Sequence, residues 1–204
     1  MRTAPVLALA AVGLAGSLVL LGGCGGPTKA GREARSAAAD RAAAFSAGAT
    51  YQQAEQELVA GRFDRAIDSI DRAISAQPDM PEYRILKGRA MLESDRLQRA
   101  EEAFVGAVAA AERSIAAIDE RVAEREEQAG EPLKERDLER IEIERRAVRR
   151  VEAEAWYYLG IVRQRWNRIE QAAADYAQAH DVDPQPVAYL VAACEMLLDL
   201  RRPE

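Results

Sequence analysis

The sequence predicts an all-α protein in which helix pairs stack into a solenoid. The chain of 204 residues is rich in Ala, Arg and Glu, which are good helix formers, and only 5% of it is aromatic. A pattern of small and large apolar residues recurs along the chain, and such self-similarity is typical of repeat proteins. Gly and Pro separate the apolar stretches at points where helices are expected to end or begin.

Residues 1–23 have the features of a secretory signal peptide. Arg2 precedes an uncharged apolar stretch from Pro5 to Leu21, and the small residues Gly22 and Gly23 follow it. A charged start, an apolar middle and a small-residue end are typical of such peptides, which are removed from the mature protein. An uncleaved membrane-spanning helix is the alternative, but about 17 apolar residues is the lower limit for a span.

The sequence Leu-Gly-Gly-Cys at residues 21–24 resembles the lipobox of bacterial lipoproteins. The resemblance implies that Cys24 is alkylated with diacylglycerol, is exposed by cleavage and then receives an N-acyl chain. Two or three acyl chains anchor a protein firmly, at about 0.8 kcal/mol for each buried methylene. Because Gly25 is not aspartate, the Gram-negative sorting rule implies the periplasmic face of the outer membrane. The alternatives are the inner membrane and an ordinary signal peptide with an incidental Cys24.

Residues 24–45 are expected to form the lipid-attached linker to a folded domain at residues 46–204. Gly, Ala and Arg are abundant in this segment, and large apolar side chains are almost absent. The segment has little to bury. We therefore expect a flexible tether that becomes helical near Ala37–Ala44 and holds the folded part away from the bilayer.

Three stretches of the folded part share one pattern, at about residues 47–80, 81–114 and 153–186. Their matching positions are Ala54, Ala66, Ile70, Ala73 and Pro78, then Gly88, Ala100, Phe104 and Ala107, then Trp156, Leu159, Gly160, Ala172, Tyr176, Ala179 and Pro184. Ala66 and Ala100 lie 34 residues apart. This pattern resembles the tetratricopeptide repeat (TPR), a helix-turn-helix unit of 34 residues. An unrelated helical bundle is the alternative.

The residue types in this pattern have physical reasons. Gly or Ala at the crossing of two helices lets their backbones approach, and large apolar residues fill the gaps on either side. Pro78 and Pro184 cannot continue a helix, so each closes a repeat. A single helix pair cannot cover its apolar face, so the pairs must stack.

The TPR resemblance implies a concave groove, lined by the first helix of each repeat, in which a partner segment binds. The family's groove positions correspond here to Tyr51, Glu55, Leu58, Ile85, Arg89, Leu92, Tyr157, Ile161 and Gln164. This mixture suits an extended peptide or a helix. Chaperone-binding TPR domains hold a terminal carboxylate with Asn and Lys at such positions. Because Glu55, Arg89 and Ile161 depart from that set, we do not expect a carboxylate clamp.

Residues 115–152 form an insertion between the second and third repeats. Gly130 and Pro132 are almost its only helix breakers, which predicts an antiparallel helical hairpin that turns near residue 131. Apolar residues pair across the hairpin in the predicted register, as Val122 with Leu138, Ile118 with Ile141 and Ile115 with Val148. The hairpin should project roughly 25 to 30 Å as a charged arm. It serves either to contact a partner or only as a solvated spacer.

Residues 186–201 are expected to form a helix that caps the last repeat, as solenoids require. Val187, Leu190, Val191 and Leu197 are among its apolar positions. Cys194, in its middle, cannot form an internal disulfide if Cys24 carries lipid. We expect Cys194 to be a small buried hydrophobic residue.

The sequence contains no recognisable arrangement of catalytic or metal-binding residues. The single histidine, His180, lies near a helix end and is expected to be structural, and no Cys or His cluster has metal-ligand spacing. A net charge of −6 argues against nucleic-acid binding. No cofactor other than the lipid on Cys24 and no small-molecule substrate is expected.

We therefore expect a membrane-anchored TPR lipoprotein of the bacterial cell envelope that is not an enzyme. It would act as an adaptor or assembly scaffold, with proteins or peptides of the envelope as partners in its groove. One alternative is a structural spacer or oligomerisation module that uses the charged arm and has no groove ligand. Another is an enzyme with an unrecognised carboxylate site.

Overall fold

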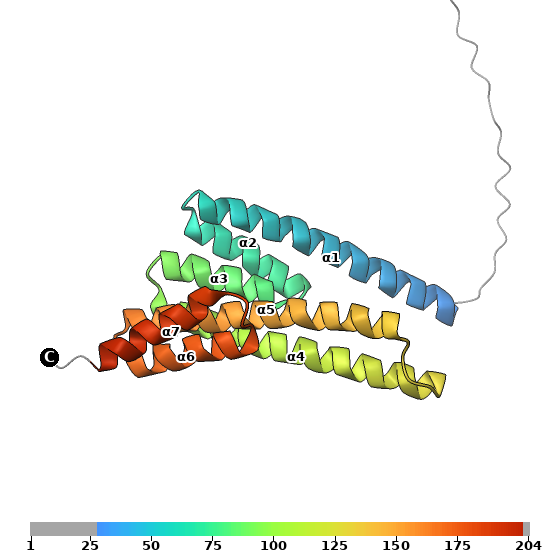
Figure 1. The fold of residues 1–204 in the computed structure, drawn as a ribbon. Helices are drawn as coiled ribbons and strands as arrows, with labels where there is room; N and C mark the ends of the chain where they lie inside the picture. Colours follow the sequence, from blue (N-terminus) through green and yellow to red (C-terminus); the bar gives the residue numbers. More distant parts are fainter. Residues whose placement is uncertain (1–27, 202–204) are drawn as a thin grey trace, which may run out of the picture. The chain divides into compact units, whose positions relative to one another are not determined.

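The computed structural model describes residues 28–201, and the regular secondary structure of this part of the chain is entirely helical. Its helices are α1 (Lys29–Val59), α2 (Phe63–Ala76), α3 (Pro81–Glu93), α4 (Leu97–Ala129), α5 (Glu135–Arg165), α6 (Ile169–Val182) and α7 (Val187–Leu200) (Figure 1). The predicted signal peptide and Cys24 lie outside the described residues. None of the described helices is long and apolar enough to cross a membrane. Residues 28–37 separate from the rest as a unit of their own, so the packing below concerns residues 38–201.

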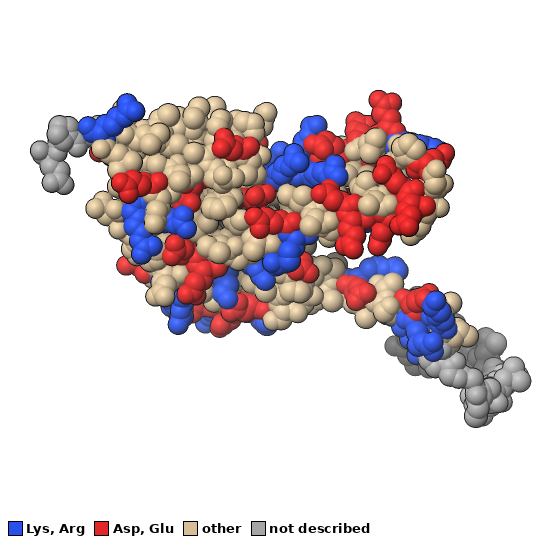
Figure 2. Space-filling model, turned by 90° about the horizontal axis from the view of Figure 1, so that it is seen from below, with Lys and Arg blue, Asp and Glu red and all other residues tan. Residues whose placement is uncertain are grey.

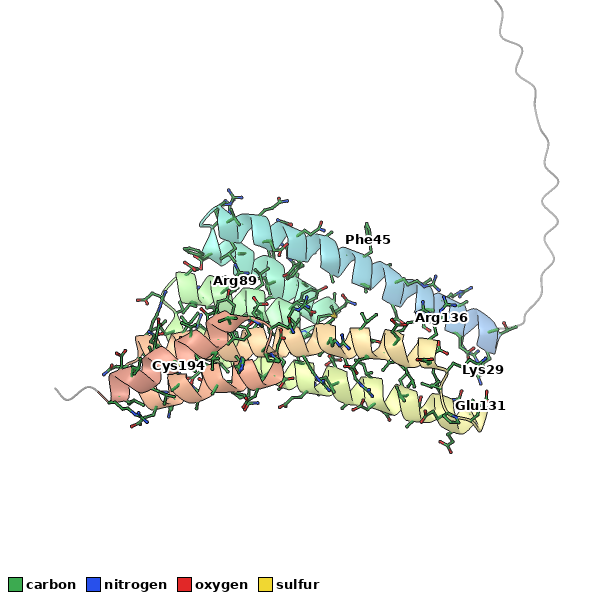
Figure 3. The ribbon with its side chains drawn as sticks, viewed as in Figure 1. Lys29, Phe45, Arg89, Glu131, Arg136 and Cys194 are labelled. Atoms are coloured by element: carbon green, nitrogen blue, oxygen red, sulfur yellow. The ribbon has the colours of Figure 1, made fainter. Side chains whose placement is uncertain are left out.

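The predicted flexible tether differs from the structure, because α1 is helical from Lys29 onward. No proline follows Pro27 until Pro78, and alanine is the strongest helix former. Helix propensity therefore extends the helix well before its first core contacts. Ala47 and Ala54 are buried, whereas Phe45, labelled in Figure 3, is 82% exposed.

The three predicted repeats are the helix pairs α1–α2, α3–α4 and α5–α6, and this prediction of the fold is confirmed. One core cluster joins α1, α2 and α3, a second joins α2 to α5, and two more join α5 and α6 to α7. The repeat alanines Ala66, Ala100 and Ala172 are completely buried. Each pair thus covers the apolar face of the next, as stacking requires.

Two glycines let the paired helices of repeats two and three approach closely. A Cβ atom on Gly88 would lie 2.5 Å from Cε1 of Phe104, and one on Gly160 would overlap the ring of Tyr176. In repeat one the corresponding residues are the alanine Ala54 and the smaller Ile70, and both are completely buried. The size of the facing side chain therefore decides whether a methyl group fits at the crossing.

The turn inside each repeat has the same geometry in all three pairs. Gly61, Asp95 and Asn167 adopt positive φ angles of 70°, 59° and 57°. The arginine that follows each of them donates its N–H to the carbonyl oxygen five residues earlier, at Glu57, Met91 and Arg163. This left-handed helix end is a Schellman motif, which satisfies carbonyl groups that the ending helix leaves free.

The predicted arm is confirmed as the joined far halves of α4 and α5 (Figure 1). Gly130 ends α4 with a φ of 66°, and α5 begins at Glu135. Ion pairs cross the arm from Arg121 to Glu144, at 2.7 Å, and from Arg145 to Asp119, at 2.5 Å.

The predicted apolar pairing along the arm is only partly correct. Ile118 and Ile141 are both buried, as expected, but Leu138, the predicted partner of Val122, is 45% exposed. Val122 instead lines a small cleft together with Ile141. The turn between the helices occupies residues 130–134. A longer turn shifts the register of the two helices, which sequence periodicity alone did not define.

Candidate protein-binding face

The structure separates the nine predicted groove residues into buried and accessible groups. Ile85 and Leu92 are each only 4% exposed, so their prediction as groove residues is wrong. They lie on α3, between the neighbouring repeats, and pack with Leu159 and Val162 of α5. Leu58 of α1 is half-buried against the same core. An interior first helix buries one side against each neighbour, which leaves a narrower strip for a ligand than the family pattern implied.

The three predicted groove residues of α5 are also engaged within the protein. The Tyr157 ring lies 5.1 Å from that of Tyr189 on α7, and Ile161 packs against the cluster that joins α6 and α7. The Tyr176 hydroxyl donates a hydrogen bond of 2.8 Å to Oε1 of Gln164. These residues therefore hold the end of the solenoid together.

Of the other predicted groove residues, Glu55 of α1 is exposed, Tyr51 of α1 and Arg89 of α3 are half-buried, and Gln164 is exposed on α5 beside its bond to Tyr176. Tyr51, Glu55 and Arg89 remain as candidates for contact with a ligand. Three residues that the sequence analysis did not single out join them, namely Glu82 of α3 with Glu154 and Tyr158 of α5. We call these six residues the first-helix face, because each lies on the first helix of a repeat. The Arg89 guanidinium lies 5.8 Å from the centre of the Tyr158 ring, and Figure 3 labels Arg89 on α3.

Aromatic packing fixes the tyrosines of this face. Tyr51 and Tyr83 have ring centres 5.2 Å apart, in a tilted contact between α1 and α3. Tyr158 stacks on the buried Phe104 with ring centres 5.1 Å apart. Such contacts contribute about 0.5–1.5 kcal/mol beyond area burial, and they hold the hydroxyl ends in place.

The face has an excess of negative charge around one guanidinium. Burial raises the pKa of Glu154, Arg89 opposes this rise, and Glu82 adds to it. Burial also raises the pKa of Tyr51, and Glu55, Glu154 and Glu82 raise it further. These mutual effects show that the carboxylates of three different helices act on one region.

One atom of the face has an unsatisfied capacity to accept a hydrogen bond. Oε2 of Glu82 is buried and has no hydrogen-bond partner. A buried carboxylate oxygen without a partner is costly, because it has lost water and gained nothing in return.

Glu82 and Glu154 could have been found from the sequence. Each lies six residues before the crossing glycine of its own repeat, Gly88 or Gly160. Comparison of the repeats position by position would have shown acidic residues at the same place on two adjacent first helices. The groove positions carried over from the family did not include that place.

Other notable polar groups of residues 28–201 lie outside the first-helix face. No group of three or more His, Cys, Asp and Glu side chains in this range could hold a metal ion. Lys87 lines an open pocket between α2, α3 and α4, but its ammonium is paired with Asp71 at 2.6 Å. His180 is half-buried on α6, and its Nδ1 atom has no hydrogen-bond partner.

Comparison with solved structures identifies the arrangement of the helix pairs. The TPR domain of Arabidopsis OM64 matches with a TM-score of 0.55 and 15% identity, over 77% of this chain and 98% of that domain. The first TPR domain of Spaghetti (RPAP3), bound to the HSP90 peptide SRMEEVD, matches with a TM-score of 0.54 and 16% identity, over 78% and 96%.

The chain has the TPR fold. The second TPR domain of human RPAP3, in complex with the HSP70 peptide SGPTIEEVD, also matches, with a TM-score of 0.51 and 13% identity over 77% of this chain and 97% of that domain. No protein-family model and no curated protein matches the sequence. Structural similarity at such low sequence identity shows the fold alone. The ligand of this chain must therefore be inferred from its own residues.

Proposed function

We propose that this protein is a membrane-attached TPR adaptor that binds a cationic segment of another protein on its first-helix face, and that it is not an enzyme. The observation that carries the proposal is the excess of carboxylates on this face: Glu55, Glu82 and Glu154 all act on Tyr51, and among the six residues of the face only Arg89 is a cation. Tyrosine rings and carboxylates together favour Lys and Arg side chains, through cation–π contact and charge-assisted hydrogen bonds. The carboxylate of Glu82, whose Oε2 has no hydrogen-bond partner, adds to the negative charge of the face.

The negative charge of the first-helix face does not suit the peptides bound in the matched complexes. Those peptides, SRMEEVD and SGPTIEEVD, are acidic at their C-terminal ends. An acidic end would meet three carboxylates on the first-helix face, and like charges at close range are repelled. The same fold is therefore expected to bind a segment of the opposite charge.

Site-specific photo-cross-linking tests the proposal. A photo-reactive amino acid at Glu55 in the full chain, expressed in cells, should capture a protein segment that contains Lys or Arg. The control places it at Gln178, which is exposed on α6. The double variant Glu82→Gln/Glu154→Gln should reduce capture at position 55 at least five-fold, since it removes charge without changing size. Equal capture at both positions, or an acidic captured segment, would contradict the proposal.

The charged arm supports a second candidate function, as a spacer or oligomerisation module. Ile143 and Leu138 are 61% and 45% exposed on the arm, so it has apolar surface available for a contact. A variant in which a short Gly-Ser turn replaces residues 119–144 separates the two functions. Capture at position 55 should persist in this variant if the adaptor proposal is correct. Loss of capture in this variant, with capture retained by Glu82→Gln/Glu154→Gln, favours the spacer.

Membrane attachment is the other part of the proposal. The lipobox-like residues 21–24 support it, with lipid on Cys24 and the periplasmic face of the outer membrane as the proposed location. The lipid would keep the TPR domain at a bilayer surface, where its partner segment would also be presented.

A further inference from the structure

A groove lined by α2, α3 and α4 has an apolar floor and a basic rim. Its floor is formed by Ile67, Met91 and Ala103, and its rim by Arg84, Lys87 and Arg99, and we call these six residues the α2–α4 groove. The groove has a volume of about 550 Å³, which is within the usual range for binding pockets. No residue of the first-helix face lines it, so it is a separate site.

The equivalent groove over α5 is filled by the protein's own side chains. At the same repeat positions, the three floor residues are replaced by Glu101, Arg163 and Asp175. Nε of Arg163 lies 3.3 Å from a carboxylate oxygen of Glu101 on α4, and its Nη1 lies 2.6 Å from one of Asp175 on α6. One guanidinium therefore joins the two flanking helices. Three apolar side chains cannot form such a bridge, so the floor of the α2–α4 groove stays open.

Two arginines of the rim have no carboxylate partner within residues 28–201. The ion pairs of this range use Lys87, with Asp71 at 2.6 Å, but neither Arg84 nor Arg99. Cδ of Arg84 lies 3.4 Å from the place of a Cβ atom on Gly106, so its stem reaches toward α4. A guanidinium donates two parallel hydrogen bonds to a carboxylate, which makes acidic side chains its natural partners.

The surroundings of the groove reverse the sign of the chain's net charge. Arg99 also lines a cleft with Arg96 and Trp166, and Arg96 lines another with Arg62 and Arg65. Six Lys and Arg side chains and four Asp and Glu side chains line the three clefts, whereas the whole chain has 28 and 34. Figure 2 shows the contrast, because red carboxylates crowd the arm. A local excess of positive charge attracts acidic partners.

We propose that the α2–α4 groove binds an acidic segment of another protein. An apolar side chain of the segment lies on the floor, and its carboxylates pair with Arg84 and Arg99. A small amphipathic anion is a poorer occupant, because such ligands need walls that bury most of their surface and this groove is open. The domain then holds two segments of opposite charge, an acidic one here and a basic one on the first-helix face.

Fluorescence anisotropy with synthetic peptides tests the charge of the occupant. The full chain is placed in nanodiscs of neutral phosphatidylcholine, and the probe is a short labelled peptide that combines Glu with Leu. Replacement of every Glu in the probe by Gln or by Lys should weaken binding at least ten-fold. Binding should also weaken as salt is added, because salt screens exposed charges. Equal affinity for the acidic and neutral probes would overturn the proposal.

Variants of the chain test the place of binding. Arg84→Gln/Arg99→Gln should weaken binding of the acidic probe at least ten-fold. Arg146→Gln/Arg149→Gln is the matched control, because both arginines are exposed on α5 and line a different cleft. This control should bind the probe as the natural protein does. Unchanged binding by the first variant, or an equal loss in both, would show that the groove is not the site.

A filled floor tests the apolar contact. Ala103→Phe should abolish binding of the acidic probe without a change in charge, and circular dichroism checks that each variant keeps its helices. The test with Arg84→Gln/Arg99→Gln does not depend on this substitution. Glu82→Gln/Glu154→Gln should bind the acidic probe normally, which separates this groove from the first-helix face.

Lipids are the other source of an amphipathic anion. Oleate and vesicles of phosphatidylglycerol are therefore added to the natural protein and to Arg84→Gln/Arg99→Gln. Arginine-dependent binding of either lipid, without binding of the acidic peptide, would replace the protein segment with a lipid and overturn the proposal. Displacement of a bound lipid by the acidic peptide agrees with it.

Discussion

At the scale of single residues, the absence of a side chain at Gly160 determines how closely α5 and α6 approach. A methyl group there would overlap the ring of Tyr176, which is almost completely buried and donates to Gln164. Forcing extra volume into a packed core costs about 1–3 kcal/mol. We expect Gly160→Ala to lower the free energy of unfolding by this amount in urea denaturation. Gly48→Ala is the control, because nothing lies within 4 Å of its Cβ position, and it should stabilise the helix slightly.

The carboxyl of Asp175 makes stability depend on pH. It is only 3% exposed and pairs with Arg163 at 2.6 Å. Burial raises its pKa from 3.8 to about 6, and Arg163 opposes this rise. A raised carboxyl pKa means that the folded state holds the proton more tightly. The resulting stability is present below pH 3.8 and is lost as the pH rises through about 6.

Asp175→Asn should remove this dependence. The free energy of unfolding of the variant, relative to the natural protein, should rise by up to about 3 kcal/mol between pH 4 and pH 7. Arg163 stays charged over this range. The loss of its charged partner in the variant therefore changes the free energy of unfolding by the same amount at every pH. Urea denaturation at intervals of half a pH unit measures the change. A constant difference between the two proteins would show that Asp175 does not titrate in this window.

At the scale of helices, the arm should depend on its few buried residues and not on its many charges. The Arg121–Glu144 ion pair is exposed, and exposed pairs contribute about 0–1 kcal/mol. Ile118 is only 3% exposed, and truncation of such a residue costs about 2–5 kcal/mol. We expect Ile118→Ala to increase the hydrogen exchange of arm amides far more than Arg121→Ala. Similar increases for both variants would contradict this ranking.

The repeat turns show why helix ends are easier to predict than helix faces. The positive φ angles of Gly61, Asp95 and Asn167 occur at equivalent places, and Gly, Asp and Asn tolerate this conformation best. Such a turn is a local property of a few residues. Which side of α3 or α7 faces a neighbour depends on residues far away in the sequence. The burial of Ile85 and Leu92 therefore escaped prediction. The prediction that Cys194 is buried is wrong for the same reason, because α7 packs with its other side and leaves Cys194 exposed.

At the scale of the whole molecule, attachment to a membrane should depend on one atom, the sulfur of Cys24. Cys24→Ser should leave the protein without lipid and release it from the membrane fraction, because no other part of the proposal supplies an anchor. Mass spectrometry of the N-terminal peptide and fractionation of cells measure the two effects. Cys194→Ser is the matched control and should remain attached. Membrane attachment of Cys24→Ser equal to that of the natural protein would refute the lipid anchor.

The sequence by itself determined the helical fold, the number of repeats, the position of the arm and the crossing glycines. These features depend on local propensity and on spacing within one repeat, which single residues such as Gly88, Gly130 and Pro184 reveal. The sequence also pointed to Tyr51, Glu55 and Arg89, three members of the first-helix face.

The tertiary structure alone decided which apolar surfaces are covered. It placed Ile85 and Leu92 inside and brought Glu82 and Glu154 to the same face as Arg89. It also left apolar residues of α7, among them Val187 and Leu198, exposed. Burial is a property of how several helices pack together, since each apolar side can be covered by any neighbour of matching shape. A periodic pattern shows that a helix has an apolar side, and only packing shows what lies against it.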